Sequence, residues 1–131
     1  MNIVDTRVNR EEDPYRLYAV VRTDLDMSAG KIAAQAGHAF LDSFENCRKG
    51  DEARAISYKQ DHHGIKVTLA IESEEELLEL AKVAKANGIF HEVVLDLGYT
   101  QFEGQPTVTA LGIGPIRKGE FPELQKYNTM R

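Results

Sequence analysis

The chain has one cysteine, no tryptophan and no long apolar run. A lone cysteine forms no internal disulfide and no CxxC zinc pair, which agrees with a reducing compartment, and we expect Cys47 to be a small buried side chain. No segment approaches the roughly 20 apolar residues that span a membrane. The first residues also lack the basic and apolar regions of a signal peptide. These absences predict a cytoplasmic protein without a membrane anchor.

Positive charge is in deficit, with 16 Lys and Arg against 21 Asp and Glu and a net charge of −5. This balance argues against broad attraction to nucleic acid or to anionic membranes. A polyanionic partner would need a local basic patch. The cations that could form one are Lys31, Arg48, Lys49, Arg54, Lys59, Arg117 and Lys118. The alternative is that they are ordinary solvated surface residues.

Length and apolar content, 131 residues and 42%, suit one domain with a substantial core. Residues 1–15 are polar and charged and end near Pro14, so they are predicted to form a flexible N-terminal arm. The single domain is predicted to cover 16–131.

Hydrophobic periodicity predicts the elements of that domain. Strands are expected at 16–23, 65–71, 91–98 and 107–114, helices at about 28–47 and 73–88, and shorter helical turns within 51–60 and 121–127. Ser73 and Glu76 form a capping-box pattern, and Asn87-Gly88 is a stop signal. The last two strands are joined too briefly for a helical crossover. The predicted fold class is α/β, a single domain with a four-stranded mixed sheet sandwiched by α-helices.

The helix near 28–47 is expected to have a polar edge and a core edge. Helical spacing places Lys31, Gln35, His38 and Asp42 in one stripe, with Ile32, Ala36, Phe40 and Phe44 on the opposite side. The simpler alternative is that the polar edge is only solvated surface.

Lys31 lies in the first turn of this helix, where a cation opposes the helix dipole. Unpaired N–H groups at a helix start, beside Gly30 and Lys31, form a natural seat for a phosphate or an oxyanion. A P-loop is excluded, because its first glycine would be Leu25 and its Ser or Thr would be Ile32.

A second polar cluster follows the third predicted strand, in "DLGYTQFEGQPT". Asp96 lies at the carboxyl end of that strand, where α/β sheets usually bind ligands. Thr100, Gln101 and Thr107 add hydroxyl and amide groups. The alternative is a turn-capping aspartate with ordinary strand-end residues.

Two other polar pairs are not assigned to a site. His62 and His63 are adjacent and lack the i, i+4 spacing of a helical metal pair, so they are expected in a loop. Arg22 and Asp24 flank the end of the first strand, where a structural ion pair or turn cap is as reasonable as catalysis.

Three ordered blocks carry a family resemblance: "VVRTDLDMSAGKIAAQAGHA", "ESEEELLELAKVAKANG" and "LDLGYTQFEGQPTVTALGIGP". They resemble the successive signature blocks of the type II peptidyl-tRNA hydrolases, over nearly all of 16–115. The resemblance implies an α/β fold with a four-stranded mixed sheet, frequent homodimers, and hydrolysis of the ester between a peptide and the terminal ribose of tRNA. It implies no metal and no organic cofactor.

The resemblance also assigns roles by matching positions. Catalytic roles fall on Lys31, Asp96 and Thr100. Substrate-binding roles fall on Gln35, His38, Gln101 and Thr107. Tyr99 is also predicted to bind substrate, although it stands where the family usually has arginine. Asp96, supported by Thr100, is expected to orient or deprotonate water, and Lys31 to stabilise either the oxyanion or a terminal phosphate of tRNA.

This chain departs from the family pattern where tRNA binding is concerned. The family usually has "KMGKGK" where this chain has "DMSAGK", and arginine where it has Tyr99. Phosphate contacts supply much of the affinity for nucleic acid. Tyr99 could instead stack on a base of the single-stranded acceptor end. Two alternatives stay open: a noncatalytic module that binds an RNA end or a phosphate, and a divergent hydrolase of a small ester or amide.

Overall fold

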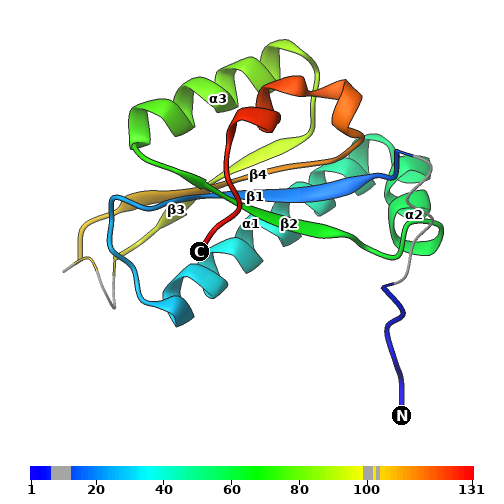
Figure 1. Ribbon diagram of the computed structural model, residues 1–131, viewed down its shortest axis with the longest axis horizontal. Helices are drawn as coiled ribbons and strands as arrows, with labels where there is room; N and C mark the ends of the chain where they lie inside the picture. The colour runs from blue at the N-terminus through cyan, green and yellow to red at the C-terminus, as the bar shows by residue number, and fades with distance from the viewer. Residues whose placement is uncertain (7–12, 99–101, 103) are drawn as a thin grey trace.

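A computed structural model describes residues 1–6, 13–98, 102 and 104–131. Its elements are β1 (Arg16–Arg22), α1 (Ala29–Gly50), α2 (Glu52–Gln60), β2 (Lys66–Ile71), α3 (Glu74–Ala86), β3 (His91–Asp96) and β4 (Thr107–Ile116) (Figure 1). Two 3-10 helices follow, Lys118–Glu120 and Pro122–Lys126. Within these described ranges, no helix is long and apolar enough to cross a membrane.

The four strands form one sheet in the order β2-β1-β4-β3. β1 pairs with β2 in parallel, and β4 pairs antiparallel with both β1 and β3. β1, β2 and β3 therefore run in one direction, and their carboxyl ends share one end of the sheet. Helices α1 and α3 lie on opposite faces of the sheet (Figure 1). The predicted fold class, with β1 as a central strand, is confirmed.

Serine side chains cap the first turns of the two longest helices, α1 and α3. The Ser28 hydroxyl accepts from the Lys31 N–H at 3.2 Å, and the Ser73 hydroxyl accepts from the Glu76 N–H at 3.1 Å. Each bond satisfies a backbone donor that the helix itself leaves without a partner. The cap at Ser28 fixes the place where α1 begins and thereby places Lys31 in its first turn.

Helix α1 is rotated relative to the prediction. Its buried residues are Gln35, Ala36, Ala39, Ser43 and Cys47, whereas Phe40 and Phe44 are only half-buried. A Cβ on Gly112 of β4 would overlap the Ala39 carbonyl, so it is the glycine that lets the helix backbone lie directly on the strand. Small residues therefore face the sheet, and the predicted placement of Gln35 on a polar edge is wrong.

The C-terminal residues cover one edge of the sheet. The Ala70 N–H donates to the Asn128 carbonyl at 2.8 Å, and the Met130 N–H donates to the Thr68 carbonyl at 2.9 Å. An open strand edge is a template for pairing with other chains. The tail thus protects β2, whereas β3 pairs with β4 alone among the described segments.

Cys47 is fully buried and free, as predicted. Burial raises the pKa of its thiol to about 11, so the reactive thiolate is scarce at pH 8. We expect a thiol reagent to label the native protein on the order of 100-fold more slowly than the urea-unfolded chain. Stopped-flow labelling at pH 8 measures both rates. Equal rates would contradict the described burial of this side chain.

Candidate functional site

Lys31 and Asp96 form an ion pair at the carboxyl ends of the strands. The Lys31 ammonium Nζ lies 3.1 Å from Asp96 Oδ1, and the two side chains are 14% and 18% exposed. The pair is thus largely shielded from water but still open to a ligand. Sequence reasoning placed these residues in two separate clusters, and the fold brings them together across 65 positions.

The directions of β1 and β3 explain why Lys31 and Asp96 lie close together. β1 ends at Arg22, and the chain turns back into α1, whose capped first turn carries Lys31. β3 runs in the same direction as β1 and ends at Asp96. Both side chains therefore reach the same end of the sheet, which is where open α/β sheets place ligands.

Gly98 fixes the orientation of the Asp96 side chain. Its N–H donates to Asp96 Oδ2 at 3.1 Å, an Asx-type turn that fixes the carboxylate. Gly98 has a positive φ of 82°, and an added Cβ would overlap the backbone of Gln105. The sequence analysis missed Gly98, although an aspartate two residues before a glycine is a recognisable signal for such a turn.

Phe102 is a second residue that the sequence analysis missed. The Lys31 ammonium lies 5.5 Å from the centre of its ring. A cation at this distance is attracted by the face of an aromatic ring. Phe102 also packs against the core cluster beneath α1, so it ties the lysine to the interior.

Gln35 and His38 have different surroundings on α1. Gln35 is 2% exposed, and its Oε1 accepts from the Thr109 hydroxyl at 2.5 Å. His38 is exposed. Both line a hollow of about 340 Å³ together with Asp42 of α1 and residues 93–97 of β3 and the turn after it. Because Asp96 also lines this hollow, it is continuous with the ion pair.

Thr107 lies next to Asp96 on the neighbouring strand. The two residues are paired in the register of β3 and β4. The Thr107 hydroxyl donates to the Gln105 carbonyl at 2.9 Å, which holds Gln105 beside the start of β4. Tyr99, Thr100 and Gln101 lie outside the described residues, so their predicted roles stay predictions.

Arg22 and Asp24 form the structural ion pair considered above. Arg22 Nε and Nη2 donate to the Asp24 carboxylate at 3.0 and 2.7 Å, and Nη1 donates to the Val108 carbonyl at 2.8 Å. The hydrogen bond from Arg22 lowers the pKa of Asp24. The pair joins the end of β1 to β4, beside the site.

Several cations of the considered basic patch are engaged within the chain. Arg48 pairs with Glu45 at 2.9 Å, and Arg54 donates to both carboxylate oxygens of Glu120 at 2.8 Å. The bond from Arg54 lowers the pKa of Glu120. These pairs reduce the positive charge that the surface offers to a polyanion.

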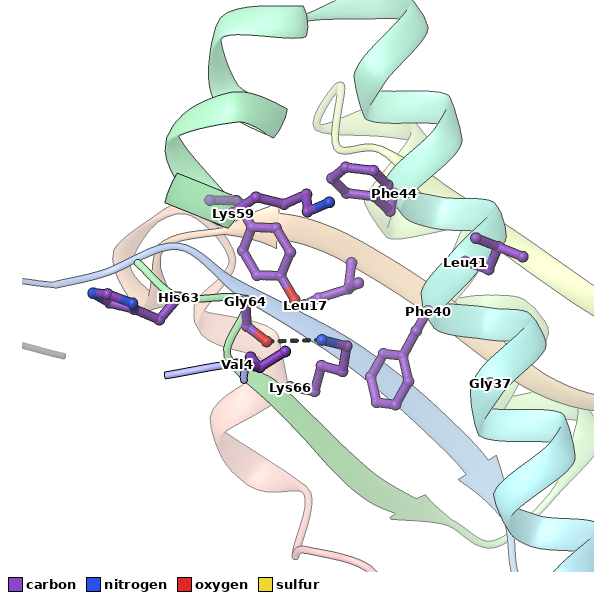
Figure 2. A pocket seen from close by; sticks show the side chains of 11 residues that line it. Val4, Leu17, Gly37, Phe40, Leu41, Phe44, Lys59, His63, Gly64 and Lys66 are labelled. Atoms are coloured by element: carbon purple, nitrogen blue, oxygen red, sulfur yellow. Dashed lines mark hydrogen bonds between the residues drawn. The ribbon is translucent and has the colours of Figure 1, made fainter. Parts of the chain in front are cut away.

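A larger, apolar hollow of about 500 Å³ lies at the other end of the sheet, near the starts of β1 and β2. Figure 2 shows Phe40, Leu41 and Phe44 on its α1 wall, with the bond from Lys66 Nζ to the Gly64 carbonyl across its floor. It contains none of the predicted site residues.

Comparison of the sequence with known proteins places this chain in a family. The profile of the family described as peptidyl-tRNA hydrolase PTH2 matches residues 15–127. A protein of Methanococcus maripaludis named peptidyl-tRNA hydrolase is 38% identical over 112 residues, which cover 86% of this chain and 95% of that one. One of Methanopyrus kandleri with the same name is 41% identical over 110 residues, covering 84% and 92%. A probable peptidyl-tRNA hydrolase 2 of Dictyostelium discoideum is 40% identical over 108 residues, covering 82% and 50%. This chain, with its paired Lys31 and Asp96, therefore belongs to the peptidyl-tRNA hydrolase PTH2 family.

Proposed function

We propose that this protein hydrolyses the ester that joins a peptide, or an N-blocked amino acid, to the 3′ end of tRNA. Family membership and the names of its relatives support this function. The observation that carries it here is the Lys31–Asp96 pair, 3.1 Å apart and largely enclosed at the carboxyl ends of the strands. A positioned carboxylate can act as a general base on water, and a fixed cation can stabilise the oxyanion that forms at the ester carbonyl.

In this mechanism Asp96 acts on the attacking water. Each carboxylate oxygen has two acceptor positions, so the bonds from Lys31 and Gly98 leave room for a water molecule. Asp96 takes a proton as the water oxygen bonds to the ester carbon. The bond from that carbon to the ribose 3′ oxygen then breaks, and the proton passes from Asp96 to this leaving oxygen. The products are a free peptide carboxylic acid and a tRNA with its 3′ hydroxyl.

Lys31 stabilises the negative charge that develops on the ester carbonyl oxygen during this step. The carbonyl oxygen becomes an oxyanion, and a fixed ammonium stabilises it without reorganisation. The neighbouring start of α1 favours an anion as well. Binding of a terminal tRNA phosphate by Lys31 is the alternative role.

The remaining assignments are part of the same proposal. Thr100 supports the attacking water, and Gln35, His38, Tyr99, Gln101 and Thr107 bind substrate. Assembly as a homodimer, a cytoplasmic location, and an arm at 1–15 ahead of a domain at 16–131 stay predictions.

Hydrolysis of N-acetylaminoacyl-tRNA by the purified protein tests the function. We expect release of N-acetylamino acid, with kcat/KM falling steeply as salt rises from about 50 to 200 mM, because phosphate contacts displace counterions. Rapid acid quench followed by counting of the released label measures both quantities.

The competing functions give different results in the same assay. A noncatalytic module would bind tRNA without turnover above buffer. A hydrolase of a small ester would cleave a p-nitrophenyl ester at a rate that salt hardly changes. Either result in place of tRNA hydrolysis would contradict the proposal.

A further inference from the structure

β3 is the sheet edge that the described chain leaves uncovered. It pairs with β4 on one side only, whereas the C-terminal tail hydrogen-bonds to β2 at the opposite edge. Soluble proteins usually protect such edges, because exposed backbone groups pair readily with another strand. An edge left open beside a reaction site is suited to bind an extended peptide.

Successive residues of β3 direct their backbone N–H and C=O groups to opposite sides of the strand. The Phe90 carbonyl accepts from the Gly114 N–H at 2.8 Å, so alternate residues, Glu92 and Val94, direct their backbone groups toward β4. His91 and Val93 direct theirs outward. In agreement, the His91 carbonyl accepts from Asn46 Nδ2 of α1 at 3.0 Å. Val93 is thus the first outward-facing residue beyond this covered end, and Leu95 is the next one in the same alternation.

A trough runs along this edge, starting from the ion pair. One wall is α1, with Gln35, His38 and Asp42; the other is β3, from Asp96 back to Val93. Lys31 meets this trough through its ion pair with Asp96. Both walls lead away from the reacting atoms in the same direction. The side chains of Leu95 and Leu97 are 55% and 53% exposed and offer apolar surface at its mouth.

We propose that the peptide part of the substrate binds as an added strand along β3, with its C-terminal carbonyl at Lys31 and Asp96. The proposal rests on the function proposed above. Because the ester carbon must lie beside Asp96, the peptide extends back along the trough toward His91. It then runs in the same direction as β3 and pairs with it in parallel, through Val93.

This binding mode recognises the backbone of the peptide and not its side chains. Main-chain hydrogen bonds are common to all peptides, so an enzyme using them accepts many sequences. At about 3.3 Å per residue, the stretch from Asp96 to His91 takes roughly four to five substrate residues. Longer peptides would gain nothing more.

Peptide length is the variable that tests the proposal. We expect kcat/KM for N-acetyl-oligoalanyl-tRNA to rise by about tenfold from one to four alanines, as one or two net hydrogen bonds are added, and then to level off. Each peptide nitrogen is then N-methylated in turn. Every second N–H of a strand faces a given neighbour, so methylation should cancel the rise in kcat/KM only at every second nitrogen. The methyl groups at the intervening positions are the matched control.

Val93→Pro gives the corresponding test on the protein. Proline is tolerated on edge strands where its missing N–H faces outward. In this variant the ratio of kcat/KM for the four-alanine substrate to kcat/KM for the single-residue substrate should fall toward one. If it does not fold, the N-methylated substrates still decide the question with the unaltered protein.

The outcomes separate the two proposals. Hydrolysis of all substrates at one rate, or equal effects of N-methylation at every position, would overturn strand addition and leave the hydrolase intact. No hydrolysis of any substrate would overturn the function itself, and strand addition with it. A homodimer that Val93→Pro dissociates in sedimentation, without length dependence, would show that a second copy occupies the edge and would overturn the proposal.

Discussion

Asp96→Asn is expected to lower kcat for hydrolysis of N-acetylaminoacyl-tRNA by about 10²–10⁴-fold, the usual contribution of a positioned acid or base. The amide keeps the size of the carboxylate, but it cannot take a proton from water or hold the Lys31 ammonium at 3.1 Å by charge. Lys31→Ala should also abolish most turnover, because the oxyanion loses its fixed cation. Single-turnover release of labelled amino acid, with folding checked by circular dichroism, measures both losses.

Glu45→Gln is the matched control for these two variants. Glu45 also forms an ion pair on α1, with Arg48 at 2.9 Å, but this pair is exposed and lies outside the site. Its loss should leave kcat unchanged. Full activity of Asp96→Asn, with the variant folded, would remove Asp96 from the proposed mechanism.

Phe121→Ala is expected to lower the free energy of unfolding by about 3–5 kcal/mol, the range for deleting a buried phenylalanine side chain. Phe121 is 1% exposed and lies in the core cluster beneath α3, with residues of β1, β2 and β4. Removing its ring leaves a cavity that the surrounding sheet cannot readily fill. Urea denaturation followed by circular dichroism measures the change.

Ile56→Ala provides the comparison for that measurement. Ile56 is 46% exposed on α2, and surface substitutions usually change stability by about 0.5 kcal/mol or less. Phe121→Ala should retain the activity of its folded fraction, because the residue lies outside the proposed site. Equal unfolding midpoints for the two variants would show that the segment after β4 contributes little to the core.

The elements were predictable because their signals are local. The run from Leu17 to Val21 contains enough β-branched and apolar side chains to predict a buried central strand, and Ser73 marks a helix start that a single hydrogen bond confirms. The tail at 128–130 shows no strand pattern. Its bonds to β2 use backbone groups alone, so no side-chain periodicity announces them.

The site was predictable only in part. The residues of the Lys31–Asp96 pair were identified by motif and family resemblance, whereas their distance depends on the direction of β3 relative to β1. The burial of Gln35 was not foreseen, because it depends on the close approach of α1 to β4, which Gly112, far along the chain, permits. Such long-range packing has no signature in the spacing of the helix residues themselves.

The position of β4 has a consequence for how the chain is made. β4 is the last strand in sequence, yet it lies between β1 and β3 and joins them. A ribosome synthesises the chain from its N-terminus, so β1 and β3 are complete before the strand that links them exists. The end of the sheet that holds Lys31 and Asp96 therefore assembles only as synthesis finishes, and an interrupted chain that stops before 107 has no formed site.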